Sequence, residues 1–334
     1  MKIILIKIGI FILNIIYFFI KLFPINKNKV TFISRQSNEV SLDFTMIAKE
    51  LKQQNENIKI VFLCKKLGTS FSEKVKYCFH MVKQMYNIAT SKVVILDSYC
   101  IPVCVLKQKK KLVVIQIWHA LGSLKKFGYS SLDKKDGRNS KLAKAMKMHR
   151  NYTYILTSSN LSKKFFKEAF NARDEQMLVM NLPRVDFLKS EKEQEKMRIR
   201  FVGVYPETNN KKQNILYCPT NRKGQKIPIE NIVKDIPLDK YNFIAKLHDG
   251  TEVIYVKGKK IEKTSNFTGM ELLHVADYII TDYSAIVYEA AITQKPIYFY
   301  TYDYEEYQIN RGTYIDYMSE MPGPICKDFK EIMK

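Results

Sequence analysis

Apolar residues recur with two different periods along most of this chain. Short continuous apolar runs are typical of strands that are covered on both faces. In the first half these expected strands are 30–34, 58–63, 93–96, 112–117 and 154–157. Residues 42–51 carry apolar positions at helical spacing, and the Ser-Ser-Asn sequence at 158–160 suits the start of a helix that runs to Phe170. The alternation of strands and helices predicts a parallel, doubly wound α/β sheet.

The pattern changes near residue 187 and then resumes. Residues 187–200 are charged and have helical spacing, whereas 206–213 are polar and typical of a loop. Further strands are expected at 215–218, 241–246, 253–256, 278–281 and 297–300, with a helix over 284–293. We therefore predict two Rossmann-like domains that face each other across a cleft, at 29–186 and 214–334, joined by a linker at 187–213. In such sheets ligands bind outside the carboxyl ends of the strands.

The first 24 residues form the most apolar segment of the chain. Its uninterrupted apolar run, 8–20, is bracketed by Lys7 and Lys21 and is shorter than the ~20 residues that a spanning helix needs. No small-residue cleavage site follows, which argues against a signal peptide. We predict that 1–24 is a membrane-associating segment in the bilayer interface, with a true span and a buried helix as alternatives.

The formal net charge of +22 narrows the range of partners. A strongly basic chain attracts polyanions, which here means nucleic acid, anionic lipid or phosphate-rich substrates. The apolar N-terminal segment beside so many basic residues favours an anionic cytoplasmic membrane surface over nucleic acid. The six cysteines include no C-x-x-C pair, which argues against structural zinc and favours a reducing compartment.

Two histidines stand directly at the ends of expected strands. Trp118-His119 follows the apolar run 112–117 without a spacer, and a histidine there suits proton transfer near neutral pH. Gly122 and Ser123 follow with backbone N–H groups. His248 comes just after the expected strand 241–246, so both histidines would reach the same cleft. A histidine satisfied by a neighbouring carbonyl is the alternative for His119, and a metal pair lacks further ligands at suitable spacing.

The sequence Thr281-Asp282-Tyr283-Ser284 lies where a strand passes into a helix. Unpaired N–H groups and the positive end of the helix dipole favour a pyrophosphate at that position. The alternative is that Asp282 or Ser284 only caps the helix. Glu289 lies one turn further along and is placed to accept a hydrogen bond from a ribose hydroxyl.

Three arginines lie in loop-like settings: Arg184, Arg222 and Arg311. Arginine suits bidentate recognition of phosphate, although each one taken alone also fits a solvated surface. The chain contains no glycine-rich G-x-G-x-x-G or Walker sequence, so neither a dinucleotide site nor a P-loop is predicted.

Taken in order, these segments resemble the CDP-glycerol glycerophosphotransferase family, which includes the teichoic acid primases and polymerases. The resemblance is carried by 276–284, 295–300, Tyr302-Asp303, Arg311-Gly312 and 322–324. Trp118-His119 before Lys125-Lys126 is similar to the family's tryptophan–histidine–glycine motif. Residues 183–186 are similar to its proline–arginine–asparagine–aspartate motif, and 246–248 to its lysine–leucine–histidine–proline motif.

The chain departs from the family pattern at five positions. These are Ala120 for glycine, Val185 for asparagine, Asn221 for tryptophan, Asp249 for proline and Ala285 for serine. None of these changes removes an ionisable group that is assigned to the chemistry.

The resemblance implies a GT-B-like fold and the partners of the reaction. The C-terminal domain would hold the donor, CDP-glycerol or CDP-ribitol, and the N-terminal domain the acceptor. The acceptor would be a lipid-linked saccharide on polyprenyl diphosphate, or a polyol-phosphate chain, at the cytoplasmic face of the cell membrane. No cofactor or metal is required and no nucleic acid partner is expected, while a homo-oligomer stays open.

We expect an acceptor hydroxyl to attack the phosphorus that bears the polyol and to expel CMP. His119 would take the proton, and His248 and Arg311 would neutralise charge on the phosphates. The expected substrate-binding residues are Gly122, Ser123, Lys125, Arg184, Asp186, Thr220, Arg222, Lys246, Thr281, Asp282, Ser284 and Glu289. The alternatives are a GT-B glycosyltransferase that uses a CMP- or CDP-linked sugar, and a non-catalytic basic adaptor for membranes or nucleic acid.

Overall fold

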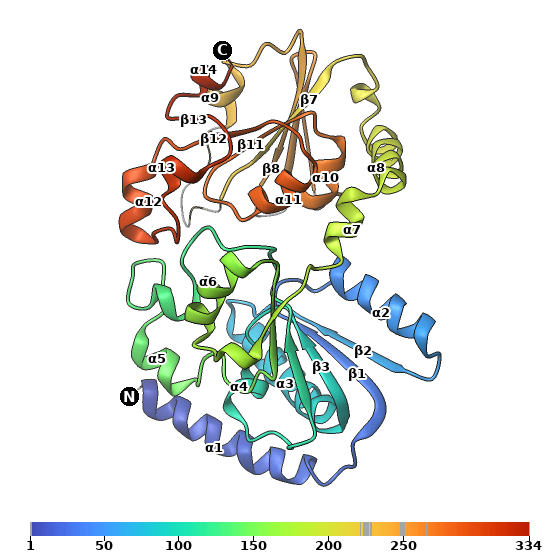
Figure 1. Cartoon of the computed structure of the whole chain (residues 1–334), viewed down its shortest axis with the longest axis vertical. Coiled ribbons are helices and arrows are strands. Elements are labelled where there is room, and N and C mark those ends of the chain that lie inside the picture. Colours follow the sequence, from blue (N-terminus) through green and yellow to red (C-terminus); the bar gives the residue numbers. More distant parts are fainter. Residues whose placement is uncertain are drawn as a thin grey trace. The chain divides into compact units, whose positions relative to one another are not determined.

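The computed structural model describes residues 2–220, 222, 227, 229–247, 251–264 and 266–333. It divides into two compact units (Figure 1). The first unit holds Met1–Leu121 and Lys126–Pro183, and the second holds Gly122–Lys125 and Arg184–Lys334. Within the described ranges, each unit is built around one sheet with helices packed on it.

The sheet of the first unit has the strand order β2-β1-β3-β4-β5-β6, and all neighbouring strands are parallel. Its strands are β1 (Asn26–Ser34), β2 (Lys59–Cys64), β3 (Ser91–Leu96), β4 (Val113–Gln116), β5 (Tyr154–Thr157) and β6 (Met177–Val179). Phe32, Val94 and Leu96 are fully buried. Because helices cover both faces of a parallel sheet, its inner strands need the continuous apolar runs from which they were predicted.

The helices of the first unit connect these strands. They are α1 (Lys2–Ile20), α2 (Leu42–Gln54), α3 (Phe71–Thr90), α4 (Ile101–Val105), α5 (Ser140–Ala145) and α6 (Asn160–Phe170), with short 3₁₀ turns η1 (Gly128–Ser131) and η2 (Asp174–Gln176). Ser159 caps α6 by accepting the N–H of Ser162, as the polar residues before it predict. The long helix α3, which the apolar spacing did not single out, begins with a capping box made by Ser70 and Glu73.

The sheet of the second unit has the strand order β10-β9-β8-β7-β11-β12-β13. Its strands are β7 (Gln213–Cys218), β8 (Tyr241–Lys246), β9 (Thr251–Val256), β10 (Lys259–Thr264), β11 (Tyr278–Thr281), β12 (Ile297–Tyr300) and β13 (Ile325–Cys326). The helices are α7 (Arg184–Lys189), α8 (Glu191–Val204), α9 (Ile229–Val233), α10 (Gly269–Val275), α11 (Ile286–Ile292), α12 (Tyr304–Asn310), α13 (Tyr317–Glu320) and α14 (Phe329–Ile332), with the 3₁₀ turn η3 (Pro206–Thr208). Tyr217 and Phe243 lie at the centre of its core.

The two units share one topology in their parallel strands. The chain passes from β1 outward to β2 and then returns to β3 on the other side of β1. In the second unit it passes from β7 to β8 and then returns to β11 on the other side of β7. In such sheets ligands bind outside the carboxyl ends of the two strands between which the order reverses, the topological switch point. The loops after β1 and β3, and those after β7 and β11, are therefore the first places to look for a site.

Two details differ from the sequence expectations. Residues 187–213, expected as a linker, fall within the second unit, where α8 packs against α10. The strand β9 is not part of the parallel alternation, because it pairs antiparallel with both β8 and β10. A tight turn at Lys257 and Gly258, both with positive φ (49° and 75°), returns the chain as a hairpin.

Candidate active site

His119 follows β4, and its ring is anchored to the end of the neighbouring strand β3. Its Nδ1 lies 2.9 Å from the backbone oxygen of Asp97, and the side-chain amide of Gln36 lies 3.2 Å from the same nitrogen. The amide nitrogen of Gln36 can only donate and would need a lone pair on Nδ1, whereas the carbonyl oxygen of Asp97 can only accept and needs a proton there. The shorter contact, with Asp97, favours the tautomer with the proton on Nδ1 and the lone pair on Nε2. A carbonyl-bound histidine and a general base are therefore compatible here, since the carbonyl orients the ring.

The backbone of Trp118 explains how the next residue reaches back to β3. Trp118 has a φ of 60°, a left-handed value that costs a bulky residue about 1–3 kcal/mol and persists only where the surroundings impose it. Its N–H donates to Oε1 of Gln116 at 3.0 Å, and its ring stacks on Phe127 with centroids 4.8 Å apart. The buried Gln116 side chain in turn donates to the carbonyl of Ser98, so the ends of β3 and β4 are tied together.

Asp97 is a residue of this region that the motif analysis did not single out. It follows β3, is almost completely buried, and its Oδ1 has no hydrogen-bond partner within the described ranges. Burial raises the pKa of this carboxyl to about 6, although hydrogen bonds from Ser34 and Ser98 act in the opposite direction. The available signal was its position directly after the apolar run 93–96, the same placement that pointed to His119.

The raised pKa of Asp97 predicts a pH-dependent stability. The folded chain binds this proton between about pH 4 and about pH 6 while the unfolded chain does not, so stability falls as pH rises through that window. In Asp97→Asn that fall should be absent, and the variant should gain about 3 kcal/mol relative to the wild type across the window. Urea unfolding of both proteins at several pH values measures the difference, and a difference that is independent of pH would contradict the assignment.

The expected substrate residues just after His119 belong to the second unit. A Cβ atom on Gly122 would lie 2.7 Å from the ring of Tyr288, so the close packing requires glycine. Ser123 is buried, and its hydroxyl donates to the backbone oxygen of Lys125 at 2.9 Å. The structure thus gives Gly122 and Ser123 packing contacts within the second unit, and their contact with substrate stays a prediction.

In the second unit, the carboxylate of Asp282 joins the ends of β7 and β11 at the switch point. It is fully buried and accepts the N–H of Thr220 with both oxygens, at 2.8 and 3.0 Å. It also accepts from Nη1 of Arg222 at 2.7 Å. Arg222 forms a second, bidentate pair with Asp303, at 2.6 and 2.9 Å. These bonds fix the start of the loop after β7.

The contacts of Arg222 revise its expected role as a phosphate ligand. Its guanidinium donates to two carboxylates and to the carbonyl of Thr220, and it lies over the ring of Tyr302 at 5.0 Å. Buried carboxylates need such a counter-charge, because leaving one unpaired is strongly destabilising. We therefore interpret Arg222 as a support of the loop. Asp303 occurs in the motif series, but its pairing with Arg222 was not foreseen.

Thr281 and Ser284 also have structural contacts. Thr281 is fully buried, and its hydroxyl donates to the carbonyl of Cys218 at 2.8 Å, which ties β11 to β7; its contact with substrate stays a prediction. The Oγ of Ser284 accepts the N–H of Ile286 at 3.4 Å, a long contact at the start of α11. Ala285, and not Ser284, is the N-cap residue of α11, and the contact of Ser284 with pyrophosphate stays a prediction.

Two buried threonine hydroxyls at the carboxyl ends of strands in the second sheet have no hydrogen-bond partner among the described residues. The Oγ1 atoms of Thr220 and Thr301 are buried and have no hydrogen-bond partner in the part of the chain that the structure describes. They follow β7 and β12, the two strands on either side of β11. Because buried hydroxyls are nearly always satisfied, these two are available to a bound ligand. Thr220 was predicted as a substrate residue, whereas Thr301 was missed.

Arg184 and Glu289, both expected to contact substrate, bind each other. Nη1 of Arg184 lies 2.8 Å from Oε1 of Glu289, and the side chains are 9% and 6% exposed. Since Arg184 begins α7 and Glu289 lies in α11, the pair joins two helices of the second unit. Asp186, by contrast, is exposed on the first turn of α7 and stays a candidate.

This buried pair predicts an asymmetric effect of mutation on stability. Arg184→Met leaves the carboxylate of Glu289 buried without its counter-charge, which should lower the free energy of unfolding by about 3–5 kcal/mol. Adding Glu289→Leu should recover most of the loss, because an apolar pair of similar volume needs no counter-charge. Urea unfolding of the single and double variants tests this, and a single variant that loses less than about 1 kcal/mol would show a solvated pair instead.

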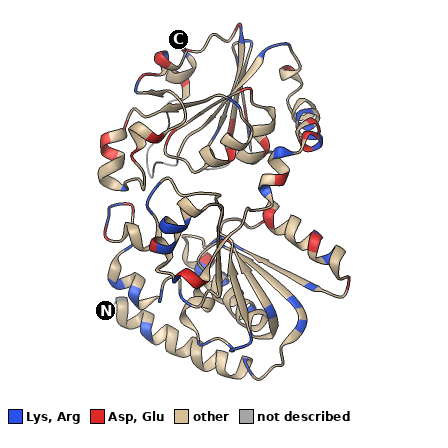
Figure 2. Cartoon of the chain, in the orientation of Figure 1, with Lys and Arg blue, Asp and Glu red and all other residues tan. Residues whose placement is uncertain are grey.

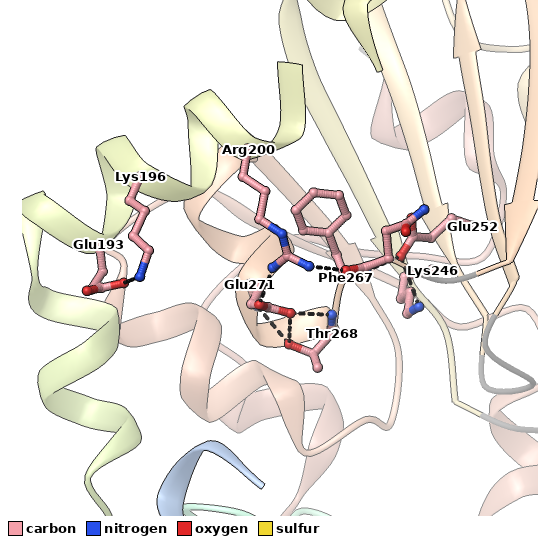
Figure 3. A network of polar contacts seen from close by, with 9 residues as sticks. Glu193, Lys196, Arg200, Lys246, Glu252, Phe267, Thr268 and Glu271 are labelled. Carbon is pink, nitrogen blue, oxygen red and sulfur yellow. Dashed lines mark hydrogen bonds and ion pairs between the residues drawn. The ribbon is translucent and has the colours of Figure 1, made fainter. Parts of the chain in front are cut away.

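Lys246, expected to bind substrate, neutralises a carboxylate in the structure. Its Nζ lies 3.2 Å from Oε1 of Glu252, which is fully buried, and the same oxygen accepts the N–H of Phe267 at 2.8 Å. Figure 3 shows this pair to the right of Phe267, with the ion pair of Arg200 and Glu271, which joins α8 to α10, on the other side. The carboxylate of Glu252 in β9 therefore joins Lys246 of β8 to the loop before α10, and the ammonium group of Lys246 neutralises it.

For His248 and Arg311, two of the three predicted catalytic residues, the structure gives less information than for His119. His248 lies outside the described residues, so its role stays a prediction. Arg311 is half-buried at the end of α12, and Gly312 follows with a φ of 79°, which glycine adopts without strain. Within the described ranges, no group of three or more histidine, cysteine, aspartate or glutamate side chains is arranged to hold a metal ion.

Comparison with solved structures defines the fold of the chain. The chain aligns over 100% of its length with 87% of the wall teichoic acid polymerase TagF, with a TM-score of 0.73 at 19% identity. It also aligns over 91% of its length with 90% of the UDP-GlcNAc 2-epimerase of Methanocaldococcus jannaschii, with a TM-score of 0.56 at 14% identity. These likenesses establish the fold, which is GT-B-like as predicted.

Sequence comparison then identifies the family. A family model described as CDP-Glycerol:Poly(glycerophosphate) glycerophosphotransferase matches residues 15–334. The chain is 30% identical over 327 residues to the teichoic acid ribitol-phosphate primase of Bacillus spizizenii, covering 93% of this chain and 82% of that protein. It is 32% identical over 265 residues to the teichoic acid glycerol-phosphate primase of Bacillus subtilis, covering 76% of this chain and 67% of that protein. The chain belongs to this family of transferases, which confirms the resemblance found in the motifs.

The aligned region covers a larger fraction of the primases than of a related polymerase. The poly(ribitol-phosphate) polymerase of Bacillus spizizenii is 30% identical over 335 residues, which is 96% of this chain but 52% of that protein. The chain thus spans most of the ribitol-phosphate primase and about half of the polymerase.

Proposed function

We propose that this chain transfers a polyol phosphate from CDP-glycerol or CDP-ribitol to a hydroxyl of a lipid-linked saccharide or polyol-phosphate chain. The observation that carries the proposal is the family match over residues 15–334, together with the identity to the two primases. Because one of these relatives is named for ribitol phosphate and the other for glycerol phosphate, both donors belong in the test.

The reaction asks little covalent work of the protein. The oxygen of the acceptor hydroxyl attacks the phosphorus that bears the polyol, a new P–O bond forms, and the bond to CMP breaks as CMP leaves with its electron pair. His119 takes the hydroxyl proton on Nε2, the nitrogen that the contact with Asp97 leaves as acceptor. The remaining acceleration comes from positioning and from stabilising charge on the phosphates.

The second unit offers the groups for the donor. Its switch point between β7 and β11 is where a doubly wound sheet holds a nucleotide. The hydroxyls of Thr220 and Thr301 are free to bind there, and we assign the pyrophosphate to Ser284 and the backbone at the start of α11. His248 and Arg311 are the residues that we propose for neutralising the transferring and leaving phosphates.

Loss of the proposed base gives the direct test. Acceptor-dependent CMP release by His119→Ala should fall about 10²- to 10⁴-fold, because the hydroxyl then loses its general base. The measurement is CMP release from CDP-glycerol and from CDP-ribitol, with a lipid-linked disaccharide as acceptor. The variant should still bind the active donor in a calorimetric titration, since the donor site is assigned to the other unit.

The same assay separates the competing functions. A folded wild-type chain that releases CMP from neither donor in the presence of acceptor would overturn the proposal. A new glycosidic bond formed from a CMP- or CDP-linked sugar would assign a glycosyltransferase instead. Salt-sensitive binding of nucleic acid without any binding of CDP would assign an adaptor.

We further propose that the first unit lies on an anionic membrane surface through α1 and α3. In the part of the chain that the structure describes, α1 is the one helix long and apolar enough to cross a membrane by length and composition, and 6% of its window Ile3–Ile20 is buried. Figure 2 shows it almost without charged residues. Its exposed apolar residues include Ile4, Leu5, Ile8, Phe11, Ile12, Ile15, Phe18 and Phe19.

The contacts of α1 favour a helix that lies along the unit rather than one that leaves it. Tyr17 is 1% exposed and its hydroxyl donates to Oε1 of Gln108 at 2.6 Å, while Phe23 meets the ring of Tyr86 in α3 at 5.5 Å. The helix α3 exposes an apolar stripe of its own, at Phe71, Val75, Phe79, Val82 and Tyr86. This spacing of three and four residues places the stripe on one face of α3, and we propose that this face continues the membrane-binding surface of α1.

The stripe on α3 makes the membrane proposal testable without removing α1. Phe71 and Phe79 are 82% and 75% exposed, so the double change Phe71→Ser with Phe79→Ser should leave the fold intact. It should weaken binding to vesicles that contain anionic lipid by about tenfold or more, because both rings lose their burial in the interface. Ile309→Ser, at a residue 78% exposed on α12, is the matched control and should bind like the wild type. Equal binding by all three proteins would exclude α3 from the membrane surface.

A further inference from the structure

The switch point of the first sheet contains a cation that the mechanism has not used. Arg35 is the residue that follows β1, and its N–H donates to the hydroxyl of Ser98, which follows β3, at 2.9 Å. Gln36 and Asp97, the neighbours of these two residues in sequence, are the ones that contact the His119 ring. Arg35 and His119 are therefore held by the same strand ends of the same unit.

The guanidinium of Arg35 is held in place mainly by neutral groups. Nη1 donates to the carbonyl of Tyr99 at 3.1 Å, and the group lies over the rings of Tyr77 and Tyr99 at 5.8 and 5.7 Å. Its Nε is buried and has no hydrogen-bond partner among the residues that the structure describes. Across the same residues no carboxylate forms an ion pair with the guanidinium of Arg35.

A half-buried guanidinium without a carboxylate is unfavourable unless an anion is available to it. Partly desolvated charges are normally paired, because the protein interior replaces water poorly. Aromatic walls orient the planar fork without neutralising it, and such a fork matches the oxygens of a phosphate. The position at the carboxyl ends of β1 and β3 is also where this topology holds ligands.

We propose that Arg35 binds a phosphate of the acceptor and thereby places the acceptor hydroxyl at His119. This inference rests on the proposed function, in which His119 deprotonates that hydroxyl and the donor is held by the second unit. The phosphate is either the diphosphate of the lipid carrier or the phosphodiester of a polyol-phosphate chain, since both present the same oxyanion to the guanidinium.

Steady-state kinetics with matched acceptors test the assignment. Arg35→Gln should raise the KM for a phosphate-bearing acceptor about 10- to 100-fold, the loss of one or two charge-assisted hydrogen bonds, and leave the KM for the CDP-polyol unchanged. With an alkyl disaccharide that carries no phosphate, the variant should match the wild type. A defect that is equal for every acceptor would mean that Arg35 only stabilises the fold, and would overturn the inference.

The acceptors also identify the phosphate. A disaccharide on a lipid diphosphate carries only the carrier diphosphate. An alkyl disaccharide that ends in a polyol phosphate carries only the phosphate of the polyol chain. The defect should appear with the source that Arg35 binds, and its absence with both would overturn the inference. Arg138→Gln is the matched control, because Arg138 also lies over Tyr99, at 5.6 Å, but is exposed; it should change the KM less than about threefold.

A binding measurement separates this inference from the proposed function. Trp118 is the single tryptophan of the sequence and its ring lies 4.1 Å from that of His119, so its fluorescence reports on this part of the first unit. Inorganic pyrophosphate should change this fluorescence saturably in the wild type and in Arg138→Gln, but not in Arg35→Gln. Because the titration needs no donor, it supports the anion site even if neither CDP-polyol releases CMP. If pyrophosphate changes the fluorescence of Arg35→Gln as much as that of the wild type, the proposed phosphate site at Arg35 is wrong, even if CMP is released.

Discussion

The parallel pairing of β1 with β3, and of β7 with β11, is the constraint on which both candidate sites depend. Parallel neighbours end at the same edge of a sheet, so the loops that leave them bring residues far apart in sequence together. In the first unit this places Gln36 and Asp97 against His119. In the second unit it places Asp282 against Thr220, although 61 residues lie between them in the sequence. The order of the strands, more than any local motif, creates these neighbourhoods.

Buried carboxylates determine which of the basic residues near the strand ends can bind a ligand. Arg222, Lys246 and Arg184 each meet a carboxylate that is buried or nearly so, and a buried carboxylate takes the nearest cation as its partner. These three residues thereby hold loops and helices in place around the candidate site. Arg35 has no such partner among the described residues, and this distinguishes it from the other cations at the strand ends.

The fold was predictable because it depends on patterns that are local. Continuous apolar runs of strand length, separated by helical spacing, indicate a covered parallel sheet, and β1, β4, β7 and β11 lie where those runs predict them. His119 was predictable for the same reason, since it follows such a run directly. The hairpin of β9 and β10 was not, because a strand that pairs antiparallel with its neighbour has the same local pattern.

The sequence by itself determined the two-unit α/β architecture, the family and the strand-end residues from which a site is built. These follow from periodicity and from motifs in a fixed order, which the chain carries whether or not it is folded. Only the tertiary structure decided which of those residues form ion pairs or hydrogen bonds with one another. Whether Arg184 meets Glu289 or a phosphate, and whether Arg35 meets any carboxylate, depends on distances of a few ångströms between segments far apart in sequence. Local sequence does not encode those distances, because they arise when the sheets and helices pack.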